Sequence, residues 1–173
     1  MGGWIRYIPP MQQALPGQIE NIASSMAPGG LIVVGTYPRL FSTTKARYIS
    51  TYGGACVLGQ TLGGVVTAGI SYRSAKAIDD ATDLGDQAIT NAVNKAQRYL
   101  AANHSSVRVV VTKTVDSEFH GHRLCDGGTW YLNGVVFASQ TSTHTLRLSF
   151  HPNAHGGQAA YGRAFRTAIA AAR

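Results

Sequence analysis

The strongest constraint on the fold is a long amphipathic helix that lies between two β-branched apolar runs. The predicted helix covers Ala77–Asn103, where apolar residues recur at three- and four-residue steps and form one stripe. The run Leu31–Val34 (LIVV) precedes it, and the run Val107–Val111 (VRVVV) follows it. Short runs of this kind are typical of strands that are buried on both faces of a parallel sheet. The order strand, helix, strand predicts a right-handed βαβ crossover.

Two further helices are predicted near the ends of the chain, over Gly17–Met26 and Gln158–Ala171. Pro9, Pro10 and Pro16 predict an irregular start before the first of them. This order of elements favours an α/β fold, although two convincing strands are few for a complete doubly wound sheet. We therefore predict a single domain over residues 1–173 that contains only part of such a sheet.

The glycine-rich stretch Ser42–Lys76 fits neither pattern, and it contains Cys56, one of the two cysteines. An excursion that is pinned by a disulfide is the most economical interpretation of this stretch. A bond from Cys56 to Cys125 would stabilise the fold by roughly 4 kcal/mol and would indicate an oxidising compartment. Two unrelated buried thiols are an equally good interpretation at this point.

Composition narrows the functional classes. The net charge is +7, but the basic residues are scattered and form no dense run. Scattered basic residues usually lie on a solvent-exposed face, so nucleic-acid binding is not predicted. No stretch of 18 apolar residues occurs, so no integral membrane segment is expected. Met1–Pro10 lacks the long apolar core of a signal peptide.

His151 is the first candidate for chemistry. It lies between the alternating run Leu146–Ser149 and a Pro152-Asn153 turn, directly before the last predicted helix. An imidazole can accept a proton from a hydroxyl nucleophile and return it to the leaving group. Taken alone, however, a single histidine in a loop is more often structural.

Two alternatives use other side chains. His120 and His122 share one face of an extended segment and could bind zinc with His151 or His155. No cysteine or carboxylate cluster supports a metal site, and none is predicted. Asp116 could orient a histidine or cap a turn.

A nucleophile is harder to find. No Gly-x-Ser-x-Gly sequence occurs, and none of the serines that we considered has a strand-turn-helix setting. Cys125 could act as a nucleophile, but a disulfide suits it better.

Three segments together resemble one family. They read LIVVGTYPRLF (Leu31–Phe41), DSEFHGHRLCDGGTWYLNG (Asp116–Gly134) and SFHPNAHGGQAAYGRAF (Ser149–Phe165). These motifs, in this order, resemble the C-terminal half of secreted actinobacterial esterases and lipases of the SGNH/GDSL type. In that family the first strand ends in a Gly-Tyr-Pro-like motif, into which this chain inserts Thr36.

The resemblance implies a three-layer α/β/α, flavodoxin-like fold and the hydrolysis of lipid or acyl esters without a cofactor. It makes His151 the general base. Many members have an aspartate three residues before the histidine, where this chain has Leu148. Relatives without it orient the imidazole with the main-chain carbonyl at that position, which assigns this role to the carbonyl of Leu148. The resemblance also implies the disulfide Cys56–Cys125 and a secreted protein.

The chain departs from the family at the nucleophile. The Gly-Asp-Ser block and the Gly-x-Asn-Asp block, which supply the serine and the oxyanion donors, are absent. Gly85-Asp86-Gln87 has no serine and lies inside the predicted helix. We therefore expect a missing N-terminal half or a partner chain to supply the serine. The alternative is a non-catalytic, degenerate relative that binds a lipid, a glycan or a partner.

A fluorophosphonate probe tests the missing nucleophile. Because no serine has the setting of an activated nucleophile, the isolated chain should remain unlabelled in an intact-mass measurement. Stoichiometric labelling of one serine would show that the interpretation of the nucleophile is wrong.

Overall fold

The structure, a computed structural model, describes residues 5–48, 55–60, 67–134 and 150–173. By its internal contacts the chain divides into two compact units. The first combines Met1–Tyr37, Ala81–Asp116 and Arg163–Arg173, and the second combines Pro38–Asp80 and Ser117–Gly162. That all 173 residues form a single domain of the hydrolase type stays a prediction.

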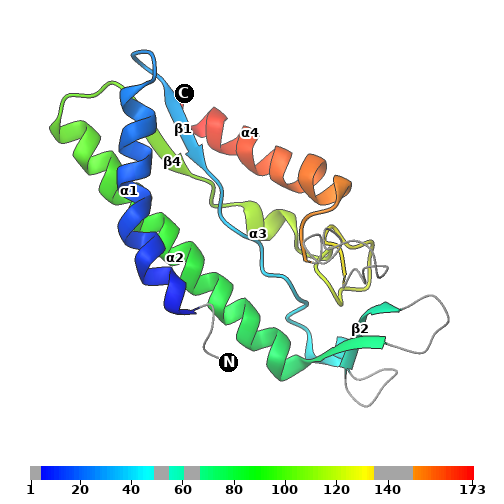
Figure 1. The fold of residues 1–173 in the computed structure, drawn as a ribbon. Coiled ribbons are helices and arrows are strands. Elements are labelled where there is room, and N and C mark those ends of the chain that lie inside the picture. The colour runs from blue at the N-terminus through cyan, green and yellow to red at the C-terminus, as the bar shows by residue number, and fades with distance from the viewer. Residues whose placement is uncertain (1–4, 49–54, 61–66, 135–149) are drawn as a thin grey trace, which may run out of the picture. The chain divides into compact units, whose positions relative to one another are not determined.

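The first unit contains the predicted βαβ crossover. Strands β1 (Leu31–Val34) and β4 (Arg108–Val111) pair in parallel, with Leu31 opposite Arg108 and Val34 opposite Val111. Helices α1 (Ile8–Ser24) and α2 (Tyr72–Ala102) cover one face of this sheet, and α4 (Gly162–Ala171) lies on the other (Figure 1). This unit therefore has three layers around a two-stranded sheet.

The core of the first unit forms where the two long helices meet the sheet. Buried apolar side chains from α1, α2 and β4 make one cluster, and half-buried side chains of β1 pack against it. The buried members are Ile19, Ala23, Ile89, Val93, Ala96, Leu100, Val107 and Val109. The stripe predicted for the long helix is thus buried in its C-terminal half, whereas Leu84, which belongs to the same stripe, is 47% exposed. The expectation of fully buried strands is wrong for β1, whose four side chains are all only half-buried.

Both long helices begin earlier than predicted. Helix α1 starts at Ile8 rather than Gly17. Pro9 and Pro10 occupy its first turn, where a backbone N–H would have no acceptor within the helix, so proline is tolerated there. Pro16 lies inside this helix and is buried. Helix α2 starts at Tyr72, so its first turn contains no acidic residue.

The second unit contains the predicted excursion. Strands β2 (Ala55–Gln60) and β3 (Thr67–Ser71) form an antiparallel hairpin, and a 3-10 turn, η2 (Lys45–Tyr48), precedes it. A disulfide joins Cys56 of β2 to Cys125. The bond closes a loop of 69 residues and ties the hairpin to the segment that follows the short helix α3 (Val115–Glu118). The interpretation as two free thiols is therefore wrong.

Asp79 is the main buried polar group of the second unit. Its Oδ1 accepts hydrogen bonds from the backbone N–H groups of Leu40, at 2.8 Å, and Phe41, at 3.2 Å. Burial raises the pKa of Asp79 from 3.8 to about 6, and the two backbone donors and the Arg123 guanidinium only partly oppose this. The carboxylate thus orders the chain at Phe41, which also forms a parallel bridge with Leu124.

The raised pKa of Asp79 predicts a pH-dependent stability. The folded chain binds this proton more tightly than the unfolded chain, so the free energy of unfolding should fall as pH rises from about 4 to about 6. Asp79→Asn keeps the accepting oxygen but removes the buried charge. Urea unfolding should show a weaker pH dependence, with a difference of about 1–3 kcal/mol across that range.

Asp80→Asn is the matched control, because Asp80 is exposed and pairs with Lys76 on the same helix. It should leave the pH dependence unchanged. An Asp79→Asn variant that retains the full pH dependence would contradict this account of Asp79.

Candidate functional site

The loop that carries His151 is held by backbone pairing to the segment around Leu132. The N–H of Asn133 donates to the carbonyl of His151 at 2.9 Å, and the N–H of Phe150 donates to the carbonyl of Asn133 at 3.0 Å. Leu132 and Pro152 form an antiparallel bridge next to these bonds. The backbone on both sides of the imidazole is therefore fixed, although the side chain itself is exposed.

Asn153 locks the end of this loop with both its backbone and its side chain. Its N–H donates to the carbonyl of Tyr131 at 2.9 Å, and its side-chain amide donates to the carbonyl of Trp130 at 2.7 Å. Its Oδ1 accepts the N–H of Gly156 at 3.0 Å, which starts the π-helical turn η4 (Gly156–Tyr161). Asn153 therefore links the His151 loop to Trp130 and to the helical turn that follows.

Phe150 adopts a backbone conformation that is rare for a residue with a side chain. Its φ is 64°, in the left-handed region, which costs about 1–3 kcal/mol for a residue other than glycine. The ring of Phe150 packs edge-on against Phe41, with centroids 6.0 Å apart. This contact and the bond from its N–H hold the residue that immediately precedes His151 in this conformation.

Leu148, whose carbonyl was predicted to orient the imidazole, lies outside the described residues. So does the predicted extended run Leu146–Ser149. The orienting role of the Leu148 carbonyl therefore stays a prediction.

A cluster of aromatic rings packs around Tyr131, which belongs to the segment that pairs with the His151 loop. The buried ring of Phe119 packs edge-on against Tyr131 and Tyr161, with centroids 6.0 and 5.4 Å away. Gly156 lies so close to the carbonyl of Tyr131 that a Cβ atom at this position would collide with it. A glycine is required there, and the close approach brings the start of the C-terminal helical segment against Tyr131.

The alternative of a histidine metal site finds no support in the geometry. The ring of His122 stacks on Tyr131 at 3.9 Å, and its Nδ1 is 2.8 Å from the carbonyl oxygen of Thr129. Among the described residues, no three His, Cys, Asp or Glu side chains are grouped closely enough to hold a metal ion. His122 is instead part of the packing around Tyr131.

The loop after β1 shows what the inserted Thr36 does. Its N–H lies 3.2 Å from the hydroxyl of the buried Thr112, and its own hydroxyl donates to the carbonyl of Thr112. The next residue, Tyr37, donates its N–H to Asp86 at 2.9 Å. Burial raises the pKa of Asp86 to about 6. Asp86 does lie inside the helix, as predicted, but it orders this loop, a role that the sequence did not reveal.

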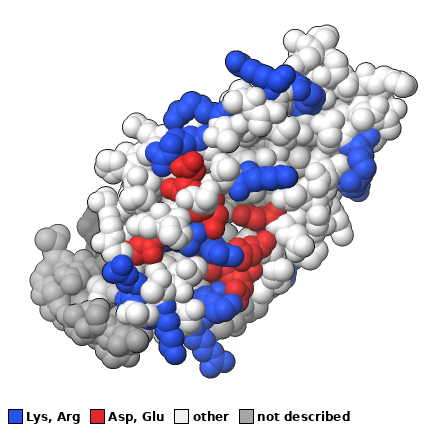
Figure 2. Space-filling model, turned by 180° about the vertical axis from the view of Figure 1, so that it is seen from behind, with Lys and Arg blue, Asp and Glu red and all other residues white. Residues whose placement is uncertain are grey.

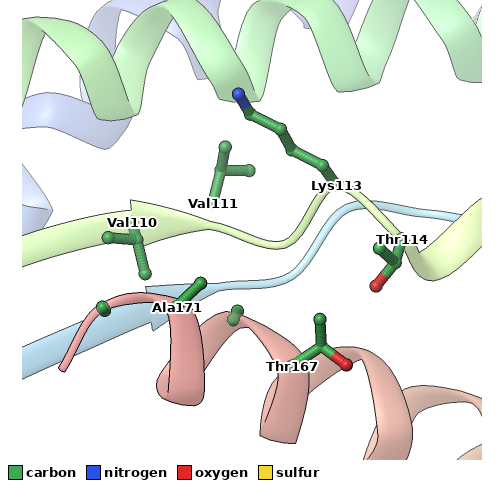
Figure 3. Close-up of a pocket in the computed structure, with 8 residues that line it drawn as sticks. Val110, Val111, Lys113, Thr114, Thr167 and Ala171 are labelled. Atoms are coloured by element: carbon green, nitrogen blue, oxygen red, sulfur yellow. The ribbon is translucent and has the colours of Figure 1, made fainter.

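The first unit contains an apolar pocket of ≈ 270 Å³ between β4 and α4. Thr167 and Ala171 point from α4 toward β4, whereas Val111 and Lys113 point away from α4 (Figure 3). None of the predicted site residues lines this pocket. It has the character of a packing gap beside the sheet rather than of a catalytic site.

Acidic and basic side chains are interspersed on the face shown in Figure 2, so that face has no continuous basic stripe. None of the helices in the described part of the chain is both long and apolar enough to cross a bilayer.

Comparison with known proteins supports the resemblance. The chain is 29% identical to a lipase of Streptomyces rimosus over 154 residues, which are 87% of this chain and 43% of that protein. The crystal structure of the extracellular lipase of Streptomyces rimosus matches 95% of this chain and 53% of its own, with a TM-score of 0.52 and 24% identity. Phospholipase A1 of Streptomyces albidoflavus NA297 matches 95% of this chain and 56% of its own, with a TM-score of 0.54 and 20% identity. No family model matches the sequence.

The comparisons confirm the predicted fold and the resemblance to this group of lipases. The chain is homologous to the Streptomyces rimosus lipase and has the α/β fold of both solved structures. It spans about half the length of these relatives.

Asn153→Ala tests the loop anchor. The substitution leaves the buried N–H of Gly156 and the carbonyl of Trp130 without their partner, so the free energy of unfolding in urea should fall by about 2–3 kcal/mol. Asn103→Ala is the control, since it removes one exposed bond at the end of α2 and should cost less than about 0.5 kcal/mol. Equal losses in the two variants would contradict the anchoring role.

Proposed function

We propose that this chain, a homologue of the Streptomyces rimosus lipase, carries the general base of a carboxylic ester hydrolase with a Ser-His mechanism, and that His151 is this base. The main support is the geometry of its loop. Backbone bonds on both sides of His151 and the left-handed Phe150 hold an exposed imidazole on a fixed main chain. A general base needs this kind of preorganisation, because proton transfer requires hydrogen-bonding distance to the reacting group.

The proposed chemistry has two half-reactions. In the first, the imidazole accepts the proton of a serine hydroxyl while the serine oxygen bonds to the ester carbonyl carbon, and then delivers that proton to the departing alcohol. In the second, it accepts a proton from water while the water oxygen bonds to the acyl carbon, and then delivers that proton to the serine oxygen as the carboxylic acid departs. The main-chain carbonyl of Leu148 accepts the other imidazole N–H and holds the ring in the required tautomer.

The serine is the part of this mechanism that the 173 residues do not supply. They contain neither a Gly-Asp-Ser nor a Gly-x-Asn-Asp block. We infer that another polypeptide segment contributes the nucleophile and the oxyanion donors, and that the present chain alone hydrolyses esters poorly.

We also infer the substrate class and the compartment. Two relatives are described as a lipase and a phospholipase A1, so the proposed substrates are lipid or acyl esters. The disulfide Cys56–Cys125 favours an oxidising compartment such as the extracellular space. The matched Streptomyces rimosus lipase is described as extracellular.

A chimera tests this proposal directly. The part of the Streptomyces rimosus lipase that this chain does not match is fused ahead of Met1, and hydrolysis of p-nitrophenyl esters is measured. We expect activity from the fusion and little from the chain alone. His151→Ala should lower kcat/KM of the fusion by roughly 10⁴–10⁶-fold, because a triad that lacks one member loses most of its rate.

His155→Ala is the matched control, because His155 is also exposed and lies in the same loop region, but has no proposed role in proton transfer. It should change kcat/KM less than threefold. Full activity of the His151→Ala fusion would sink the proposal. A fusion that unfolds cooperatively but has no activity would favour the non-catalytic binding module.

A further inference from the structure

The second unit contains a polar pocket that takes no part in the proposed hydrolysis. Its volume is ≈ 310 Å³, at the lower end of the range of about 300–1,000 Å³ for ligand pockets. The residues that line it include Arg47, Arg123, His120, Thr43 and Thr44. Its lining is mostly polar and rich in hydrogen-bond donors.

Two segments that are distant in sequence form the walls, and the backbone joins them firmly. The N–H of Ser42 donates to the carbonyl of Leu124 at 2.8 Å, and the N–H of Leu124 donates to the carbonyl of Leu40 at 2.9 Å. The disulfide at Cys125 holds the second wall next to this bridge. The pocket is therefore preorganised by its backbone.

The two arginines have different roles. Arg123 is buried, with 4% of its surface exposed, and its charge faces the carboxylate of Asp79. Asp126, which also lines the pocket, accepts the backbone N–H of Arg123 with its Oδ2 at 2.9 Å. The charge of Arg123 is thus partly offset by Asp79, and the residue forms part of the wall.

Arg47 is the exposed cation of the pocket. Its guanidinium lies against Gly127, where a Cβ atom would approach Nη1 to 2.6 Å. The missing side chain at Gly127 therefore leaves the space that this guanidinium occupies. A planar guanidinium in a defined position can donate two parallel hydrogen bonds to a phosphate or carboxylate group.

We propose that this pocket binds a small oxyanion of the phosphate type, which takes the N–H groups of Arg47 and the hydroxyls of Thr43 and Thr44. The lining contains two arginines and one aspartate, and Arg47 is the exposed arginine. The same chemistry could come from a free phosphate ester or from a lipid headgroup. The proposal does not depend on the role of His151.

Titration of the full chain with inorganic phosphate, followed by amide NMR, tests this proposal. We expect saturable shifts at Thr44, Arg47, Gly127 and Gly128. Arg47→Ala should weaken phosphate binding at least about tenfold, because it removes a charge-assisted pair of hydrogen bonds. Gly127→Ala should weaken it as well, because the added Cβ displaces the guanidinium from its place.

Two matched controls separate a built site from diffuse charge. Arg6→Ala removes an exposed arginine that contacts Tyr7, and Gly157→Ala adds a Cβ with no atom within 4 Å. Both should bind phosphate as the unaltered chain does. Shifts that do not saturate, or an equal loss in Arg6→Ala, would overturn the proposal.

Vesicle co-sedimentation distinguishes the two sources of phosphate. Binding to phosphatidic acid vesicles that Arg47→Ala abolishes supports the site and identifies a headgroup. Binding of glycerol 3-phosphate and inorganic phosphate without vesicle binding supports the site and identifies a soluble ester. Vesicle binding that Arg47→Ala leaves unchanged, together with no phosphate binding, would overturn it.

Discussion

The arrangement of the candidate site depends on one short backbone pairing, between Tyr131–Asn133 and Phe150–Asn153. Two of its hydrogen bonds flank His151, and the side chain of Asn153 extends the pairing to Trp130 and to the start of η4. The close approach of Gly156 to Tyr131 completes the junction. A side chain on an unpaired loop would sample many main-chain conformations, and this pairing restricts the main chain on both sides of His151.

Two carboxylates of α2, the buried Asp79 and the half-buried Asp86, have a comparable role for the chain that follows β1. Asp86 and Asp79 lie seven residues apart on α2, so they share one helical face. Asp86 accepts the N–H of Tyr37, and Asp79 accepts those of Leu40 and Phe41. Burial raises the pKa of both carboxyl groups, because each loses part of its contact with water when it binds this part of the chain. Phe41, once fixed in this way, supplies the ring that supports Phe150.

Periodicity predicted the elements that bury a regular face or a continuous apolar run. The stripe on α2 and the β-branched runs of β1 and β4 were found because burial on one face or in a sheet leaves a regular pattern. The start of α1 was missed, because Pro9 and Pro10 look like helix breakers but suit a first turn. Asn153 was visible within the His-Pro-Asn motif, yet its distant partner Trp130 is set by tertiary folding. The pocket around Arg47 could not be predicted, since tertiary folding brings its two walls together, at the bridge between Phe41 and Leu124 among other contacts.

The central claim is that His151 is held as a base by the carbonyl of Leu148. It is tested most directly by NMR of the chain with ¹⁵N-labelled histidine and ¹³C-labelled leucine carbonyls. The account predicts that one imidazole N–H of His151 exchanges slowly with water and shows a coupling across its hydrogen bond to the Leu148 carbonyl carbon. An imidazole in which both nitrogens exchange rapidly, as in a free histidine side chain, would contradict it.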